Sequence, residues 1–267
     1  MKPRRIPCAA LALGALLAGC APPPRPAAPL DTASLAARFE VALVAREAAG
    51  AGLDGDARLW VSGTAVRQLP ALAARLAMVG PDACRLRVQS ALGTAIDVSA
   101  RGDTLTALVP ARRAALDLNR AGDTLGVRDP GTLAFRIWSA GWRPPAAAWH
   151  DAVYEDSIMV VRWTERGDSL RLEVGSNGRP TAITLRRPRA AGLRCTYRGW
   201  SPVGGAAWPS WLEFDDTAGA VHVACRLSAL RARPGLSRES VTVRLPANTQ
   251  RLEWSKLKRS IERAGGL

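Results

Sequence analysis

Alternation of apolar and polar positions dominates the chain from residue 58 onward. In the segment 84–89, Cys84, Leu86 and Val88 fall on one face, and in 169–174 Leu170 and Leu172 do the same. A period of two is typical of strands that bury one face. Alternation or short apolar runs predict strands over 58–61, 84–89, 94–100, 104–109, 157–164, 169–174, 180–185, 193–198, 208–214, 221–230 and 241–245.

Short turn-forming sequences separate these strands. Ser176-Asn177-Gly178 predicts a hairpin, because both of its central residues accept positive φ. The segment 71–79 fits a strand or a helix equally well. Short strands with tight turns predict a mainly β fold with a few helices (α+β), in which a curved antiparallel meander covers a core with one face. Further Gly-Asp turns are predicted at Gly102-Asp103, Gly122-Asp123 and Gly167-Asp168.

A helix is predicted before the strands. Asp31 or Thr32 can cap its start, and Gly50 marks its end. Its apolar stripe recurs every four residues, as Leu35, Phe39 and Leu43. A last helix is predicted over 253–263, with Trp254, Leu257 and Ile261 on one face.

Another helix interrupts the strands. Asp129 can cap it, Pro130 suits its first position, and Pro144-Pro145 stops it. Apolar side chains extend most of the way around it, so we expect it to be buried or to cover a cavity. These side chains either line that cavity or simply fill the core. The candidate cavity residues, on this helix and on the strand at 84–89, are Leu86, Val88, Phe135, Trp138 and Trp142.

Residues 1–19 have the organisation of a secretory signal, with a basic start and an apolar run over 9–17. The run is shorter than the roughly 20 residues that a membrane span needs. The end of this segment, Leu17-Ala18-Gly19-Cys20, resembles the bacterial lipobox, which implies cleavage before Cys20 and a lipid anchor on that cysteine. The alternative is an ordinary or uncleaved signal with a chance cysteine.

Residues 20–31 are rich in proline and predict an extended tether, followed by a single domain over 32–267. The lipobox resemblance implies a bacterial cell-envelope protein whose domain lies in the periplasm. An Asp directly after the lipid-bearing cysteine resembles an inner-membrane retention signal. This position holds Ala21 instead, which favours the outer membrane. Export also argues against a nucleic-acid partner.

The formal net charge of +14 permits two interpretations. Basic surface can attract anionic lipid. Alternatively, the excess of arginine reflects a GC-rich genome, since lysine occurs only at positions 2, 256 and 258. The basic residues are scattered over many predicted strands, which favours the second interpretation.

Recognisable catalytic chemistry is missing from the sequence. The two histidines, His150 and His222, are isolated, and neither has a metal-ligand spacing. A serine-hydrolase elbow, a P-loop and a dinucleotide-binding glycine pattern are also missing. We therefore predict a protein without enzymatic activity, catalytic residues, metal or cofactor.

Three cysteines, Cys84, Cys195 and Cys225, fall on apolar faces of predicted strands. Export to an oxidising compartment permits a disulfide, for which Cys195 and Cys225 are the best candidates. The other interpretation is that all three are small buried hydrophobic residues. The count is odd, so at least one is free or pairs with another chain.

The order of lipobox, tether, helix, strands, helix and further strands resembles the LolA/LolB superfamily and its outer-membrane lipoprotein relatives. The segments 84–93 and 241–246 come nearest to a motif. The resemblance implies an incompletely closed antiparallel β-barrel, covered by helices, with a hydrophobic cavity. The first functional hypothesis is a membrane-anchored carrier or acceptor of lipid or lipoprotein acyl chains. The second is an envelope scaffold with a filled core and a protein partner.

Overall fold

The computed structural model describes residues 31–64, 70–91, 93–118, 129–188, 190–217 and 219–253. The compact unit begins at Asp31. Cys20, the proline-rich tether, the turn at Gly122-Asp123 and the helix expected after Glu253 lie outside these residues.

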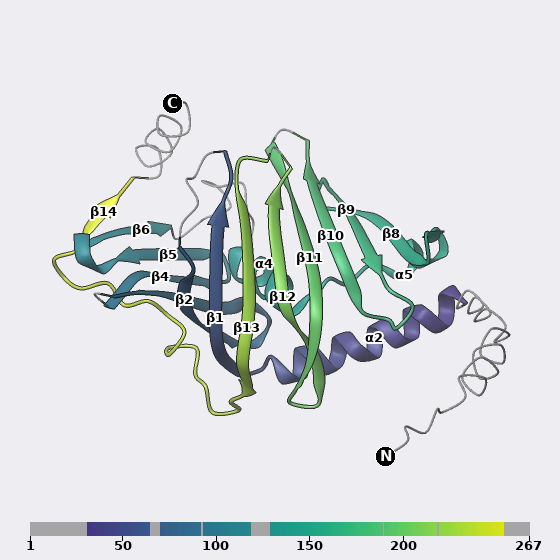
Figure 1. Ribbon diagram of the computed structural model, residues 1–267, viewed down its shortest axis with the longest axis horizontal. Coiled ribbons are helices and arrows are strands. Elements are labelled where there is room, and N and C mark those ends of the chain that lie inside the picture. Colours follow the sequence, from purple (N-terminus) through teal and green to yellow (C-terminus); the bar gives the residue numbers. More distant parts are fainter. Residues whose placement is uncertain are drawn as a thin grey trace, which may run out of the picture. The chain divides into compact units, whose positions relative to one another are not determined.

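The described residues form one open sheet of 14 strands in the order β14-β6-β5-β4-β3-β2-β1-β13-β12-β11-β10-β9-β8-β7 (Figure 1). Neighbouring strands are antiparallel, except that β14 runs parallel to β6. The sheet is curved but not closed, which confirms the predicted fold class. The strands are β1 (Leu53–Ser62), β2 (Leu72–Val79), β3 (Ala83–Ser90), β4 (Gly93–Arg101), β5 (Thr104–Val109), β6 (Ala114–Leu118), β7 (Val153–Glu155), β8 (Ile158–Glu165), β9 (Asp168–Val174), β10 (Pro180–Arg187), β11 (Ala190–Val203), β12 (Ala206–Asp216), β13 (His222–Ala232) and β14 (Gln250–Leu252).

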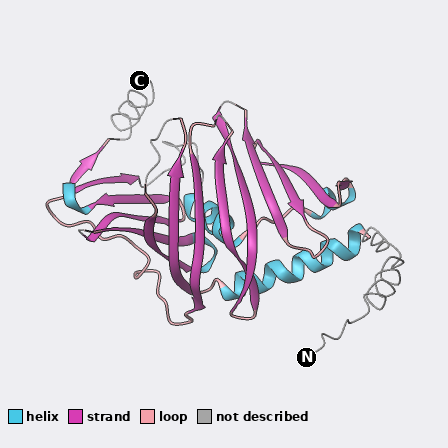
Figure 2. Ribbon diagram, in the orientation of Figure 1, coloured by secondary structure: helices cyan, strands magenta, loops and turns pink. Residues whose placement is uncertain are grey.

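Helices α2 (Thr32–Ala49), α4 (Pro130–Ser139) and α5 (Ala146–His150) gather on one side of the sheet (Figure 2). Asp31 caps α2 by accepting a hydrogen bond from the Ser34 N–H at 3.3 Å. Two single-turn 3-10 helices, η1 (Gly80–Asp82) and η2 (Pro110–Arg112), link strands. Among the described helices, none combines the length and the apolar character that crossing a bilayer requires.

The core lies between the helices and the inner face of the sheet. Leu172 of β9, Ile183 of β10 and Cys195 of β11 are successive register partners, and all three are buried. The alternation seen in the sequence thus places one residue per strand in each layer of the core. Burying a Leu or Ile side chain contributes roughly 1.5–3 kcal/mol.

The prediction of a strand over 241–245 is wrong. This segment has no strand pairing and crosses the outer face of β2 to β6 as an irregular chain (Figure 1). Val241 and Val243 are nevertheless buried, and the Val243 N–H donates to the Ser99 hydroxyl at 3.1 Å. The alternating pattern thus predicted the buried side chains, Val241 and Val243, but not the backbone structure. An extended chain that packs over a sheet also points alternate side chains toward it.

The disulfide suggested between Cys195 and Cys225 is not formed, and Cys84 is free as well. Strand β12 lies between β11 and β13, so two strand spacings of about 4.8 Å separate the two cysteines. A disulfide needs Cα atoms within roughly 7 Å of each other. The three thiols are buried hydrophobic groups, as the other interpretation of the sequence held.

We expect all three thiols to resist alkylation in the folded protein at pH 8. Burial raises the pKa of Cys84 and of Cys225 to about 12, so little reactive thiolate forms. Unfolding in urea without reductant should make all three react, as measured by mass-spectrometric peptide mapping. A linked peptide pair containing Cys195 and Cys225 would contradict the structure.

Candidate ligand-binding site

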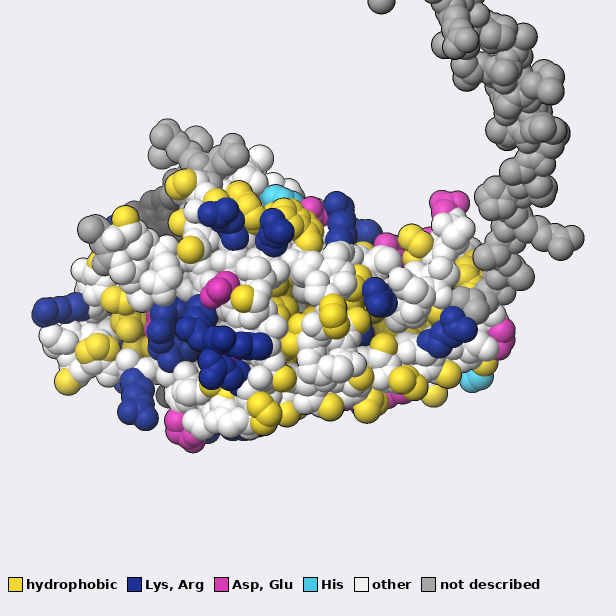
Figure 3. Space-filling view, turned by 60° about the horizontal axis from the view of Figure 1, so that its bottom comes forward, with side chains coloured by type: hydrophobic (Ala, Val, Ile, Leu, Met, Phe, Trp, Pro, Cys, Tyr) yellow, Lys and Arg dark blue, Asp and Glu magenta, His cyan; other side chains and the backbone are white. Residues whose placement is uncertain are grey.

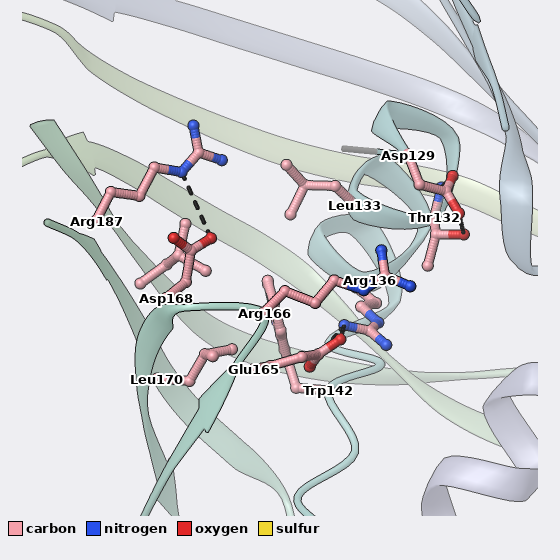
Figure 4. Close-up of a pocket in the computed structure, with 11 residues that line it drawn as sticks. Asp129, Thr132, Leu133, Arg136, Trp142, Glu165, Arg166, Asp168, Leu170 and Arg187 are labelled. Atoms are coloured by element: carbon pink, nitrogen blue, oxygen red, sulfur yellow. Dashed lines mark hydrogen bonds and ion pairs between the residues drawn. The ribbon is translucent and has the colours of Figure 1, made fainter. Parts of the chain in front are cut away.

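A pocket of about 350 Å³ lies on the inner side of the sheet, between α4 and strands β8 to β10. Ligand sites for small molecules usually start at about 300 Å³. The close-up in Figure 4 shows side chains from α4 on one side of this space and side chains from β9 and β10 on the other. The pocket therefore separates α4 from strands β8 to β10, while α4 packs against β3, β4 and β12 elsewhere on the sheet.

The start of α4 is fixed by a cap and by a glycine. The Asp129 carboxylate accepts a hydrogen bond from the Thr132 N–H at 2.9 Å. Gly131 donates its N–H to the Gly102 carbonyl at 2.9 Å. A Cβ on Gly131 would lie 2.0 Å from the Asp82 carbonyl oxygen, so only glycine permits this close approach. The helix thus has a defined position at one side of the pocket.

The floor of the pocket is apolar. Leu170 of β9 and Leu185 of β10 are direct register partners, and both are buried. Leu133 of α4 and the buried Trp142, which follows that helix, complete the apolar lining. These four side chains form the apolar part of a lining whose other seven residues are polar or charged. Apolar surface of this kind favours contact with a hydrocarbon chain over contact with water.

The rim of the pocket carries paired charges. Arg136 of α4 binds Glu165 of β8 at 3.0 Å, and Arg187 lies 3.6 Å from Asp168 (Figure 4). With Arg166 and Asp129, the residues that line this pocket include three arginines and three acids. The rim is therefore balanced in charge and favours neither sign of ligand.

Trp142 is held from two directions. Its Nε1 donates a hydrogen bond to the Tyr197 hydroxyl at 3.0 Å, and the guanidinium of Arg136 lies 5.9 Å from its ring centroid. Tyr197 is buried, and burial raises the pKa of its hydroxyl well above the usual range. The phenol stays protonated, so Trp142 lines the pocket with a neutral hydrogen-bond partner behind it.

Of the five cavity residues expected from the sequence, only Trp142 is among the residues that line this pocket. Trp142 lines the pocket, whereas Trp138 packs edge-on against Phe214 with ring centroids 5.7 Å apart. Phe135 is buried against Gly50, the residue that ends α2. Both side chains therefore belong to the core contact between α4 and its neighbours. Two others, Leu86 and Val88, lie on β3, over which α4 packs.

Sequence reasoning missed Leu170, Leu185 and Leu133 as pocket residues. The two strand leucines do alternate with polar neighbours in the sequence, but so do many others. Only the register between β9 and β10 shows that these two leucines are direct partners in the pocket lining.

In the part of the chain that the structure describes, the polar groups outside the pocket form no recognisable catalytic set. His222 Nδ1 lies 2.6 Å from the Asp215 carboxylate, and both side chains are about half-exposed. His150 ends α5. Within the described residues, no group of three or more His, Cys, Asp or Glu side chains could hold a metal ion.

No family model matches the sequence, and no curated protein matches it. Its fold is nevertheless similar to solved structures. A LolA superfamily protein from Nitrosomonas europaea aligns with a TM-score of 0.53 at 12% identity, over 77% of this chain and 97% of that one.

Two further structures extend this similarity. A domain described as an outer membrane lipoprotein-sorting protein from Vibrio parahaemolyticus gives a TM-score of 0.52 at 11% identity, over 76% of this chain and 94% of its own. A DUF1329 family protein from Desulfovibrio piger gives 0.51 at 10% identity, with 79% and 95% covered. The described part of the chain therefore has the fold of the LolA superfamily.

Proposed function

We propose that this protein is a lipid-anchored envelope protein that binds the acyl chains of a lipid or lipoprotein in the pocket between α4 and strands β8 to β10. The observation that carries the proposal is the apolar floor formed by Leu133, Trp142, Leu170 and Leu185. A pocket of this kind gains about 0.8 kcal/mol for each methylene group that it removes from water.

The location supports a carrier or acceptor of acyl chains. The lipobox ending at Cys20 provides a lipid anchor, and the residues after it provide a tether. The domain described as an outer membrane lipoprotein-sorting protein shares the fold. A protein anchored at the periplasmic face of the outer membrane would meet acyl chains that arrive there or leave.

Uptake of a fluorescent fatty acid by the purified protein, and its displacement by unlabelled lipid, tests the proposal. Native mass spectrometry of the same preparation would identify lipid that co-purifies. Saturable uptake with displacement supports the carrier function. A protein that takes up no acyl probe would overturn it and would leave the scaffold, with a filled core and a protein partner, as the better function.

Replacing Leu133 with tryptophan should weaken acyl-probe binding by about tenfold. The larger ring would fill space equal to roughly two methylene groups of ligand, at ~0.8 kcal/mol each. Leu133 is half-buried, so the substitution should leave the unfolding temperature nearly unchanged. The Ile137→Trp variant is the matched control, because Ile137 is a half-buried residue of α4 outside the pocket lining. Equal loss of binding in both variants would argue against binding at this pocket.

A further inference from the structure

A buried arginine occupies the apolar stripe of α2. Arg46 follows Leu35, Phe39 and Leu43 on the face that meets the sheet, and its exposure is 0%. None of its three guanidinium nitrogens has a hydrogen-bond partner among the described residues. A buried charge without a partner destabilises a fold strongly. An apolar residue would suit this position better if stability alone mattered.

The surroundings of Arg46 are aromatic and positive. Its guanidinium lies 5.4 Å from the ring centroid of Trp200, and that of Arg179 lies 5.9 Å from the same ring. Tyr197 packs near Trp200, with ring centroids 6.5 Å apart. We refer to Arg46, Arg179, Tyr197 and Trp200 as the Arg46 cluster.

The acid adjacent to Arg46 in sequence does not form an ion pair with it. The carboxylate of this acid, Glu47, binds Arg143 at 3.0 Å on the surface. Burial is the main reason that the pKa of Arg46 falls to about 10. Tyr197 and Glu47 oppose this fall, and the charge of Arg179 adds to it. The guanidinium still carries its charge at neutral pH. The cluster therefore presents a permanent positive charge in a dry environment.

The cluster adjoins the pocket through one hydrogen-bonded pair. Trp142 lines the pocket and donates to the hydroxyl of Tyr197, which belongs to the cluster. The rim of the pocket is balanced in charge, whereas the cluster has two arginines and no paired acid on Arg46. An anionic group on a ligand would therefore be stabilised at the cluster more than at the rim.

We infer that Arg46 binds the carboxylate of an acyl ligand whose hydrocarbon chain lies toward the floor of the pocket. This inference rests on the proposed function and names the ligand class, a fatty acid rather than a neutral lipid. The guanidinium fork can donate two parallel hydrogen bonds to the two carboxylate oxygens. The stability lost by burying Arg46 is thus offset when the ligand is bound.

Competition between matched ligands tests the inference without any substitution. Palmitate and hexadecanol have the same chain length and differ in the charged head. Each would displace a neutral fluorescent alkyl probe from the wild-type protein at pH 8. We expect palmitate to bind at least about tenfold more tightly, as a hydrogen bond to a charged group predicts.

Substitution of Arg46 then locates the preference. Arg46→Met should bind both ligands equally, should hold hexadecanol as tightly as the wild type, and should unfold without ligand at an equal or higher temperature. If this variant does not fold, Arg46→Lys keeps the charge and should lose most of the preference, because an ammonium group lacks the fork. Arg226→Met, at an exposed arginine of β13, should keep the full preference.

The outcomes separate the two proposals. If palmitate and hexadecanol bind the wild type equally, or if Arg46→Met retains the preference, the carboxylate site is overturned and the acyl pocket stands. If neither ligand binds the wild type, the proposed function fails, and the inference that depends on it fails with it.

Discussion

Replacing Trp142 with alanine is expected to lower the free energy of unfolding by about 4 kcal/mol. The side chain is 1% exposed, so its removal leaves a cavity that the surrounding sheet and helix can fill only in part. The Tyr197 hydroxyl would also lose the donor that lies 3.0 Å away. The Trp142→Phe variant should cost only about 1–2 kcal/mol, because it keeps most of the ring volume and loses the hydrogen bond with a smaller part of the ring.

Urea unfolding followed by circular dichroism measures the free energy of unfolding of both variants. Circular dichroism is preferred to fluorescence because the chain has nine tryptophans, and the fluorescence signal would combine all of them. The difference between the alanine and phenylalanine variants isolates the volume of the ring from its hydrogen bond. If the two variants lose the same stability, the hydrogen bond rather than the ring volume would dominate, contrary to the burial of Trp142. The alanine variant should also lose acyl binding, because Trp142 forms part of the pocket wall.

The sequence predicted most of the sheet because alternation is a local signal. Segments such as 84–89 and 169–174 carry their inward residues at every second position, and they are strands β3 and β9. Short elements escaped prediction, since β7 and β14 have three residues each and α5 has five. Too few positions repeat in such elements for a period to be read. Their formation depends on neighbours that are distant in sequence.

The candidate site could be predicted only in part. Helix α4 and the aromatic Trp142 were found from the cap at Asp129 and the apolar pattern. The pairing of Leu170 with Leu185 could not be found, because it depends on strand register. Arg46 did leave a signal, since it falls three residues after Leu43 on the apolar stripe. A charge at a core position conflicts with the pattern around it, and such conflicts concentrate at functional sites.

The arginines that look scattered in the sequence are gathered by the sheet. In the view of Figure 3, basic side chains form a dense patch where acidic ones are sparse. One such gathering surrounds Asp54 of β1, which binds Arg75 at 2.7 Å, Arg231 at 2.8 Å and Arg233 at 3.3 Å. The Asp54 side chain is 6% exposed, whereas the three arginines are about half-exposed. One carboxylate therefore holds together three positive charges from β2, from β13 and from the chain just after β13.

Asp54→Asn should lower the free energy of unfolding by about 2 kcal/mol at pH 7. The hydrogen bond from Arg231, together with that from Arg75, holds the pKa of Asp54 well below its usual range, against the opposing effect of burial. Hydrogen bonds to a charged group contribute about 1.5–3 kcal/mol, and the exposure of the arginines to solvent reduces that figure. The amide would also leave three like charges without a counter-ion, so 0.5 M salt should narrow the difference from the wild type.

The pH dependence of this difference has a defined sign. A carboxylate whose pKa is depressed by folding contributes stability that is fully present above its unfolded pKa, roughly 4, and is lost as the pH falls toward its folded pKa. The gap between wild type and Asp54→Asn should stay constant from pH 8 to pH 5 and shrink by about 1 kcal/mol at pH 3. Asp56→Asn, at an exposed position of the same strand, should change stability by less than about 0.5 kcal/mol. A gap that persists undiminished at pH 3 would mean that the shape of the Asp54 side chain, and not its charge, holds the three arginines.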